Sequence, residues 1–397
     1  MPGTGPQVVF ATHRPPWPLD NGARIRTARL AQGLARELAV TLVTFAGGPA
    51  WEDAPAGRAE LEALLPHARI ELVPFALPPP SPDAAFGSTA SAAWGTYATP
   101  ELRAALARLV AEDPGVVLHL DSPGAGLAGI GLAPGRTVYS AHNIEHQVWR
   151  DVADRRPPGQ RAYVEVEWRK IELEERRCWA GADLCLAVSE VDAAAMRAAG
   201  ARRVEVCPNG ADPCDPLVPA PLGHGDPVRL VFVGFAGYWP YEHGLAWLAR
   251  EVLPPAGARA PVILDVVGEP PAEPVRGQGI TYHGRVDDVT PFYAAAHALV
   301  IPMFEGSGTR LKAVEAAFLG RPIISTAVGV EGLPLCPAEH YLRAETASEW
   351  VEAIQRLRTH DAEVADMAAR AREAVAHLEW PRITAALAGA YRRLAGE

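Results

Sequence analysis

The feature that most constrains the fold is an alternation of short β-branched runs with Ala-, Leu- and Arg-rich stretches of helical periodicity. The alternation occurs twice, on either side of a segment dense in proline and glycine at residues 213–227. Apolar runs of this kind are typical of strands in parallel sheets that helices cover on both faces. Because 397 residues exceed what one hydrophobic core usually serves, the sequence predicts two doubly wound α/β domains.

The predicted strands are short and each ends at a turn. They cover residues 8–12, 40–45, 69–75, 116–120, 137–141 and 184–189 in the first half, and 229–234, 262–268, 280–284, 298–303 and 322–326 in the second. A helix is predicted at 24–38, where apolar positions recur at helical spacing. Residues 78–100 are rich in proline and small side chains and are expected to form a mobile loop. Its Trp94 and Tyr97 either pack on the first domain or contact a ligand.

Composition argues against several classes of function. The formal net charge of −10 disfavours a nucleic-acid partner, because phosphate backbones need clustered cations. No zinc or redox spacing relates the five cysteines, and free thiols are expected at Cys178, Cys185, Cys207, Cys214 and Cys336. The sequence also shows neither a signal peptide nor an apolar run long enough to span a membrane. We therefore expect a cytoplasmic protein without a transmembrane segment, and peripheral membrane contact stays open.

The most informative stretch is PMFEGSGTRLKAVEAAFLGRPIIST, at residues 302–326. A strand is predicted to end at its start, and a Gly-Ser-Gly turn then opens a helix. Gly306 and Gly308 let the backbone approach a ligand closely and turn its N–H groups toward that ligand. The free N–H groups at the start of the helix favour a phosphate there.

Charged residues follow this turn at helical spacing. Arg310 adds a planar multidentate donor, and Lys312 adds a compact positive charge. Glu315 lies three residues after Lys312 and therefore on the same helical face, where its carboxylate could accept the two hydroxyls of a ribose. The alternative is a surface Lys–Glu pair on an ordinary helix whose glycine turn is only a cap. The stretch alone leaves both interpretations open, because short glycine-rich motifs recur by chance.

This stretch resembles the C-terminal signature of family-4 retaining glycosyltransferases of the GT-B fold, in the branch that carries G-S-G-T-R-x-K. Six further segments resemble the family's pattern in the correct order: HRPPWPLDNGARIRTARLAQGLA, YSAHNIEH, AVSEVDAAAMRAAGARRVEVCPNGAD, FVGFAGYWPYEHGLAWLAREVLP, VVGEPP and HGRVDDV. The resemblance covers nearly the whole chain. It implies an α/β GT-B protein with two Rossmann-like doubly wound domains that face a central cleft.

The resemblance also implies a division of the chain. Residues 1–212 would form an acceptor-binding domain and residues 228–378 a domain that binds the nucleotide-sugar donor, with 213–227 as the linker. A last helix within 379–397, which starts near Pro381, would pack back on the first domain.

The family pattern implies roles for particular residues. Glu315 would bind the ribose, and the backbone near Val286 would meet the nucleobase. Gly22 would lie close to the diphosphate and the reacting centre. His142 would face the transferred sugar, although a histidine that follows a short strand is also often a structural residue. Arg24 and Arg26 either cap the diphosphate or are ordinary solvated helix residues.

The sequence departs from the family pattern at two places. Many relatives have an acidic residue at the position of Ser307, where it touches the sugar, and here Glu305 lies two residues earlier. Either residue could make the sugar contact. Relatives also often carry Arg and Lys in the loop that follows Gly234, and this chain has neither there. We infer that Arg310 and Lys312 supply the missing positive charge, and Gly306, Ser307, Gly308 and Thr309 complete the predicted donor site.

The expected reaction is transfer of a sugar from a nucleoside-diphosphate-sugar to a hydroxyl acceptor, with retention of configuration and by front-face attack. No cofactor and no metal are expected. Two alternatives keep the fold: an epimerase or hydrolase of nucleotide-sugars, and a non-catalytic protein that binds them. The acceptor, the donor base and the oligomeric state stay open.

Overall fold

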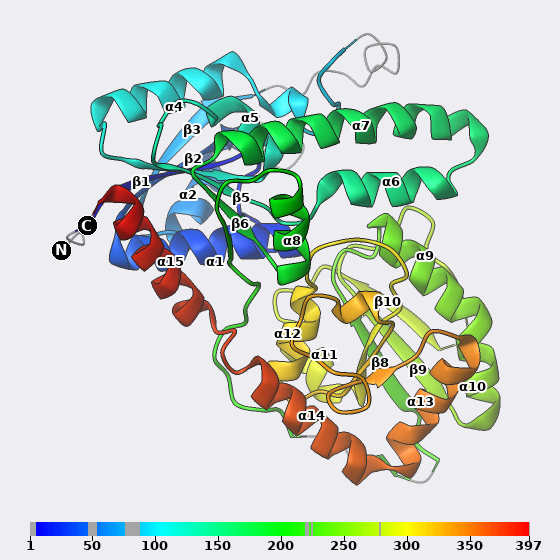
Figure 1. Cartoon of the computed structure of the whole chain (residues 1–397). Coiled ribbons are helices and arrows are strands. Elements are labelled where there is room, and N and C mark those ends of the chain that lie inside the picture. The colour runs from blue at the N-terminus through cyan, green and yellow to red at the C-terminus, as the bar shows by residue number, and fades with distance from the viewer. Residues whose placement is uncertain are drawn as a thin grey trace. The chain divides into compact units, whose positions relative to one another are not determined.

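The computed structural model describes residues 5–46, 54–75, 88–218, 222–223, 225–277 and 279–396. By its internal contacts the chain divides into two units. The first unit comprises Met1–Leu19, Ala23–Pro208 and Trp380–Glu397, and the second comprises Asp20–Gly22 and Asn209–Glu379. Each unit contains a parallel sheet with flanking helices (Figure 1), which confirms the predicted α/β class.

In the described residues, the first unit has a seven-stranded sheet in the order β3-β2-β1-β4-β5-β6-β7. Its strands are β1 (Gln7–Thr12), β2 (Ala39–Ala46), β3 (Ala68–Pro74), β4 (Val117–Asp121), β5 (Thr137–Ser140), β6 (Leu184–Ala187) and β7 (Val204–Val206). The direction of winding reverses between β1 and β4, which pair directly. In doubly wound sheets such a switch point is where ligands bind, at the carboxyl ends of the strands. The sequence did not predict β7, because this three-residue edge strand is only partly buried.

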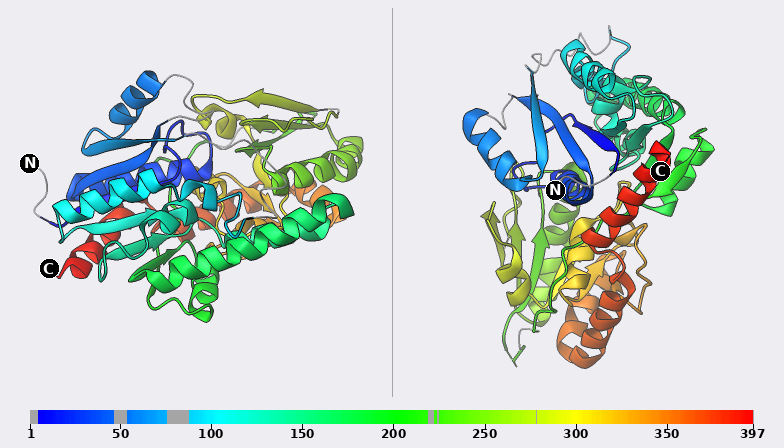
Figure 2. Two further views of the ribbon diagram at one scale, coloured as in Figure 1. Left: turned by 90° about the horizontal axis from the view of Figure 1, so that it is seen from above. Right: turned by 90° about the vertical axis from the view of Figure 1, so that its left-hand side faces the viewer.

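Helices cover both faces of this sheet, as the two views in Figure 2 show. They are α1 (Gly22–Glu37), α2 (Ala54–Leu64), α4 (Pro100–Glu112), α5 (Ser122–Gly129), α6 (Glu145–Arg155), α7 (Pro158–Gly181), α8 (Glu190–Ala198) and α15 (Trp380–Ala395), with the 3-10 helix η1 (Gly95–Tyr97). Local sequence sets several of their starts. Helix α4 begins with Pro100 in its first turn, and the Thr99 side chain accepts a hydrogen bond from Leu102 N.

The second unit has a six-stranded sheet in the order β10-β9-β8-β11-β12-β13 within the described residues. Its strands are β8 (Val228–Val233), β9 (Val262–Val267), β10 (Ile280–Gly284), β11 (Ala298–Ile301), β12 (Ile323–Ser325) and β13 (Leu342–Arg343). Its helices are α9 (Trp239–Trp247), the π-helix η2 (Leu248–Val252), α10 (Leu253–Arg259), α11 (Thr290–Ala295), α12 (Leu311–Phe318), the 3-10 helix η3 (Val328–Val330), α13 (Ala347–Thr359) and α14 (Asp361–Val375).

Two apolar layers enclose the second sheet. Successive residues of β8 alternate between them: Phe232 packs with Trp350 and its neighbours on one face, and Val231 packs with Phe318 and its neighbours on the other. Burial on both faces explains why these strands read as continuous apolar runs in the sequence. It also fixes the strand ends, from which the loops of the candidate site begin.

The segment predicted as a mobile loop is only partly described, since residues 78–87 lie outside the described ranges. Its second part is anchored to α7 by buried carboxylates. Ser91 donates from its backbone N and its hydroxyl to Glu174, and Ala92 N donates to Glu167. Tyr97 is buried and packs beside His13. These anchors lie more than 70 residues away in the chain, so the composition of the loop could not reveal them.

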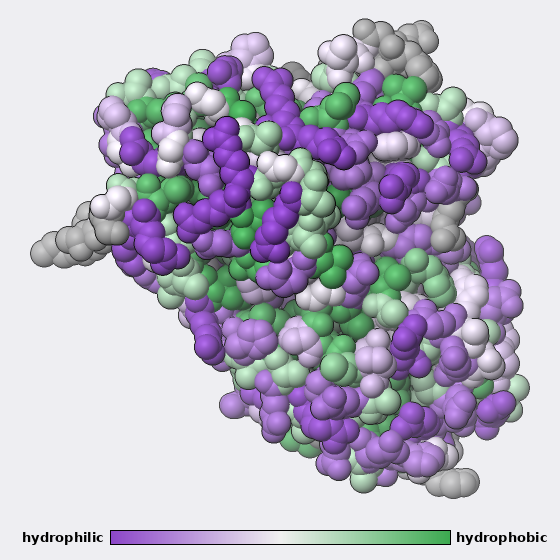
Figure 3. All heavy atoms as spheres, viewed as in Figure 1, coloured by the Kyte–Doolittle hydropathy of each residue, from purple (hydrophilic) through white to green (hydrophobic). Residues whose placement is uncertain are grey.

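Hydrophilic side chains predominate on the face of the molecule drawn in Figure 3, with apolar ones scattered between them. Among the described helices, none combines the length and the apolar character that crossing a bilayer requires.

Candidate functional site: a glycine-rich turn and an Asp–His cluster

The glycine-rich turn of the second unit connects β11 to α12. Gly306 and Gly308 have φ angles of 124° and 75°, a region that favours glycine. The buried Arg310 holds this turn from inside, because its Nη1 donates to the carbonyl oxygens of Ser307 and Gly308, both at 2.6 Å. Its Nε contacts Met303 Sδ at 2.9 Å. The guanidinium that we predicted as a phosphate ligand is thus directed at the loop's own atoms, and it orders the turn.

Lys312 lies in the first turn of α12 and is buried. Its Nζ lies 3.6 Å from the ring centroids of both Phe232 and Tyr241, a cation–π arrangement. Within the described residues Nζ has no hydrogen-bond partner. Burial, followed by the nearby charge of Arg310, holds the pKa of Lys312 well below its usual value. An ammonium with three donors and no acceptor is a strong attractor for an anion.

Two glycines let the backbone come close to this ammonium. Gly234 follows β8 with a φ of 129°, and a Cβ built on it would lie 3.1 Å from Lys312 Nζ. Gly268 follows β9 with a φ of 125°, and a Cβ there would lie 2.2 Å from Gly234 O. The carboxyl ends of β8 and β9 therefore meet beside Lys312 without space for side chains, which is the arrangement that phosphate-binding loops use.

The other predicted donor residues lie around the same helix. Glu315 is one turn beyond Lys312 and is partly buried. Burial, and after it the carboxylate of Glu315, raises the pKa of Tyr293 well above its usual value, so this tyrosine stays protonated beside the carboxylate. Val286 follows β10 and packs into the hydrophobic cluster that contains Tyr293. Gly22 groups with the second unit, and a Cβ built on it would lie 3.2 Å from Leu311 Cδ1, at the start of α12.

The two candidates for the sugar contact are both buried in the turn. Glu305 Oε1 lies 3.1 Å from His243 Nδ1, and the His243 ring stacks on Trp239 of the same helix, α9. Ser307 contributes its carbonyl to Arg310. Thr309 accepts a hydrogen bond at 2.9 Å from Asn209 Nδ2. The structure therefore brings all the predicted residues from Glu305 to Glu315 together, and both Glu305 and Lys312 contact α9, through His243 and Tyr241.

In the first unit a second polar cluster lies at the carboxyl ends of β1, β4 and β5. His142 Nε2 lies 2.9 Å from Asp121 Oδ1, and Thr27 Oγ1 donates to Asp121 Oδ2 at 2.6 Å. His13 Nδ1 lies 2.6 Å from Ser122 Oγ, and Ser122 has a φ of 80°, unusual for a residue other than glycine. The sequence prediction included His142 and missed Asp121. The available signal was an acidic residue that ends a buried strand, in HLDSP.

The electrostatics of this cluster fix several protonation states. Burial alone would raise the pKa of Asp121, but His142 and the hydrogen bonds hold it well below its usual value, so Asp121 is ionised. Burial and then Arg14 lower the pKa of His13 to about 3, so this ring is neutral. Glu145 begins α6, three residues after His142, and burial followed by the charge of Glu175 raises its pKa to about 7.

Arg26 does not fit either of its sequence interpretations. Its side chain is buried, and it donates to Cys207 O at 2.7 Å and to Pro208 O at 2.9 Å. It therefore ties α1 to the segment that leaves the first unit and is unavailable as a diphosphate cap.

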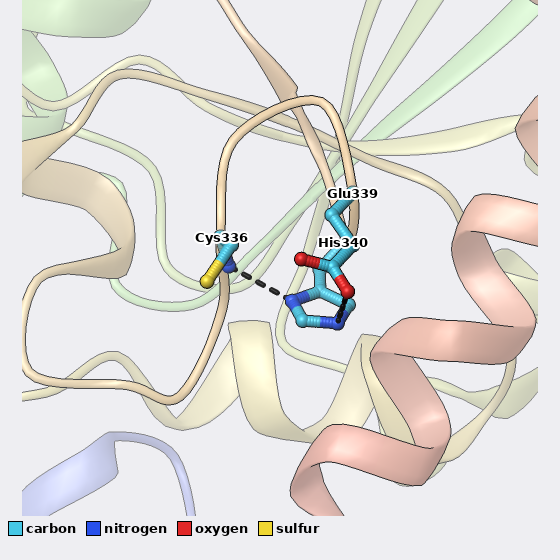
Figure 4. Close-up of side chains that lie close together, drawn as sticks. All are labelled: Cys336, Glu339 and His340. Atoms are coloured by element: carbon cyan, nitrogen blue, oxygen red, sulfur yellow. Dashed lines mark hydrogen bonds and ion pairs between the residues drawn. The ribbon is translucent and has the colours of Figure 1, made fainter.

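Elsewhere in the second unit, Cys336, Glu339 and His340 lie close together in the loop before β13 (Figure 4). His340 Nδ1 accepts a hydrogen bond from Cys336 N at 2.9 Å. The proton of the neutral ring is then on Nε2, which faces Glu339 at 3.7 Å. Neither ring nitrogen offers a lone pair to a metal in this arrangement, and the histidine shapes the turn.

Comparisons with known proteins agree with this picture. The model of the Glycosyltransferase Family 4 domain matches residues 20–214, and that of Glycosyl transferases group 1 matches residues 227–360. No curated protein sequence matches significantly.

Solved structures share the fold at low identity. Sucrose-phosphate synthase from Thermosynechococcus elongatus superposes with a TM-score of 0.72 at 19% identity, over 98% of this chain and 99% of that one. HepE from Anabaena, in complex with UDP-glucose, superposes with a TM-score of 0.68 at 15% identity, over 97% of this chain and 98% of that one. WaaG, a glycosyltransferase involved in lipopolysaccharide biosynthesis, superposes with a TM-score of 0.66 at 17% identity, over 97% of this chain and 99% of that one. Since the two family matches together span most of the sequence and these structures share its two-sheet fold, the chain belongs to the GT-B glycosyltransferases of the group 1 and family 4 type.

Proposed function

We propose that this glycosyltransferase moves a sugar from a nucleoside-diphosphate-sugar to a hydroxyl acceptor, with retention of the anomeric configuration and without a metal or other cofactor. The observation that carries the proposal is the buried Lys312 ammonium, which has no hydrogen-bond partner within the described residues. It lies beside Gly234 and within the first turn of α12. A diphosphate oxygen would satisfy its donors and offset the cost of its burial.

The roles of the donor residues follow from their positions. Lys312 and the backbone N–H groups of the glycine turn would bind the diphosphate, and Glu315 would accept the ribose hydroxyls. Arg310 would hold the turn and add positive charge behind it. The backbone beside Val286 would contact the base. Glu305, Ser307 or both would contact the sugar.

The reaction needs stabilisation of a leaving group. As the bond between the anomeric carbon and the β-phosphate oxygen breaks, negative charge grows on that oxygen, and fixed cations and N–H groups stabilise it. The acceptor oxygen would form its bond on the same face of the sugar, and its proton would pass to the departing phosphate. This route gives retention without a carboxylate nucleophile. His142 would contact a hydroxyl of the transferred sugar.

A thermal-shift panel with UDP-, GDP-, dTDP- and ADP-glucose tests the donor class. Binding to the folded state raises the melting temperature by mass action. We expect one nucleotide to stand out, with UDP first because the HepE structure holds UDP-glucose. The shift should disappear in Glu315→Ala. No shift with any of the four sugars, or an equal shift in the variant, would refute the donor site.

Proton NMR of the reaction with water as the acceptor tests the stereochemistry. From the α-linked UDP-glucose, retention releases α-glucose first, whereas β-glucose as the first product would exclude the front-face route. Conversion of the sugar without release of UDP would instead identify an epimerase.

A further inference from the structure

Three buried side chains and the partly buried His142 form a row of polar groups in the first unit. It runs from Tyr391 on α15 through His119 and Asp121 on β4 to His142, which follows β5. The hydroxyl of Tyr391 is hydrogen-bonded to His119 Nδ1. His119 Nε2 lies 3.8 Å from Asp121 Oδ1, and the same oxygen lies 2.9 Å from His142 Nε2.

The direction of each hydrogen bond follows from the protonation states. Asp121 is ionised and can only accept, so His142 Nε2 must carry a proton. In the neutral ring, His142 Nδ1 then keeps its lone pair. Burial raises the pKa of Tyr391 well above its usual value and lowers that of His119. A neutral phenol donates to His119 Nδ1, and the proton of His119 is left on Nε2, on the side of the Asp121 carboxylate.

Asp121 is also held from another side. Thr27 of α1 donates to its second oxygen at 2.6 Å. The carboxylate therefore has a donor on each oxygen and cannot rotate without losing one of them. A buried carboxylate that is held on both oxygens is stiff, and it orients the group that donates to it from the exposed side. Here that group is His142, whose side chain is 12% exposed while that of Asp121 is 1% exposed.

We propose that Asp121 is a positioning residue that fixes His142 with Nδ1 as a hydrogen-bond acceptor for a substrate hydroxyl, and that Tyr391 and His119 support it from the C-terminal helix. The assignment of the hydroxyl to a substrate rests on the proposed function. The last helix of the chain thereby contributes to the orientation of a site residue that lies about 250 residues earlier in the sequence.

The close packing of α15 against α1 places Tyr391 beside β4. Gly33 of α1 leaves room for Thr384, because a Cβ built on Gly33 would lie 2.3 Å from Thr384 Oγ1. Tyr391, two turns further along α15, is fully buried. A close approach of α1 and α15 therefore brings Tyr391 to the strand that carries His119 and Asp121.

Long-range ¹H–¹⁵N NMR of the histidine rings in the ligand-free protein tests this proposal. The signals are assigned with His142→Gln and His119→Gln. In the wild-type protein at pH 8 we expect both rings to be protonated at Nε2 and not at Nδ1. A wild-type His142 ring that is protonated at Nδ1 would overturn the proposal, whether or not any variant folds.

Substitutions then test the chain of contacts. In Asp121→Asn the amide can both donate and accept, so His142 should populate both tautomers. Tyr391→Phe removes the donor to His119 Nδ1, so His119 should also populate both tautomers. Tyr139→Phe is the matched control, because Tyr139 is equally buried on β5 and its hydroxyl has no hydrogen-bond partner within the described residues. Unchanged ring spectra in both Asp121→Asn and Tyr391→Phe would contradict the proposal.

Release of UDP from UDP-glucose separates this proposal from the function. If the enzyme acts on that donor, kcat should fall roughly 10-fold or more in Asp121→Asn, with little change in KM, and stay at the wild-type value in Tyr139→Phe. If the wild-type His142 ring is not protonated at Nε2, the positioning role is refuted whatever the activity. Failure to release any nucleotide, with the pattern intact, refutes the proposed function and leaves the positioning of His142 supported.

Discussion

Lys312 and Lys170 are the only two lysines in the sequence, and both are buried. Their surroundings differ in one respect that decides their roles. Lys170 Nζ lies 3.0 Å from Glu167, in the same helix, so its charge is paired. Lys312 has aromatic rings beside it and no hydrogen-bond partner within the described residues. A buried amine without a hydrogen-bond partner destabilises the folded chain and is typical of a site that a ligand completes.

Replacing each lysine with methionine should therefore change stability in opposite directions. Lys312→Met keeps the length and packs between the rings, so we expect the free energy of unfolding to rise by on the order of 1–2 kcal/mol. Lys170→Met leaves the buried Glu167 carboxylate without its positive partner and should lower the free energy of unfolding by about 3 kcal/mol or more. Urea unfolding of the ligand-free proteins measures both changes. A loss of stability in Lys312→Met would show that its charge is already satisfied.

Glu145 should make the free energy of unfolding depend on pH. Its pKa is about 7 in the folded chain against 4.5 as the reference value. Between these values the folded chain binds the proton more tightly, so the free energy of unfolding falls as pH rises from about 4.5 to 7. The loss is at most on the order of 3 kcal/mol. In Glu145→Gln this part of the slope should vanish, which urea unfolding at pH 5, 6, 7 and 8 measures. An unchanged slope would contradict the shifted pKa.

At the scale of elements, the ends of β8 and β9 depend on glycine. Gly268→Ala would place a methyl group 2.2 Å from Gly234 O at a φ of 125°. We expect it to displace the strand ends, lower stability by several kcal/mol and abolish donor binding. Gly257→Ala is the matched control, because it lies in α10 with nothing within 4 Å of the added methyl. It should stabilise the protein by up to about 1 kcal/mol. Calorimetric melting compares the two variants, and equal melting temperatures would refute the steric argument.

The elements also show what the sequence could reveal. The buried strands β1, β2, β8 and β9 were predicted within one or two residues, because burial on both faces produces continuous apolar runs. The short edge strands β7 and β13 were not predicted, since two or three partly exposed residues leave no such run. The π-helix η2 was also missed, because a different hydrogen-bond register has no periodic signature of its own.

Some residues of the candidate site could likewise be predicted from the sequence and others could not. Local motifs predicted the glycine turn, Lys312 and Glu315, since turn and helix geometry are set by neighbouring residues. Asp121 and Tyr391 were missed, because their roles depend on contacts with residues far away in the sequence. The direction of Arg310 was also missed. Its partners are backbone carbonyls two and three residues away, and only the folded turn shows that they face inward.

At the scale of the whole molecule, and apart from the short stretch Asp20–Gly22, the chain passes between its two units at Pro208–Asn209 and again at Glu379–Trp380. Within the second unit these two passages are joined, because Ala211 N donates to Leu378 O at 3.0 Å and Ala211 forms a bridge with Glu379. The second passage returns the last helix to the first unit, where Tyr391 reaches His119. The proposed donor residues Glu305–Glu315 and the Asp–His pair therefore belong to different units, and each can be tested separately.

The measurement that tests the central claim most directly is isothermal titration of UDP-glucose into the wild-type protein, Lys312→Met and the control Gly257→Ala. Hydrogen bonds to a charged group contribute about 1.5–3 kcal/mol, so we expect Kd to rise roughly 10- to 150-fold in Lys312→Met. Gly257→Ala should bind as the wild type does. Equal affinity of Lys312→Met and the wild-type protein for UDP-glucose would contradict the assignment of Lys312 to the diphosphate.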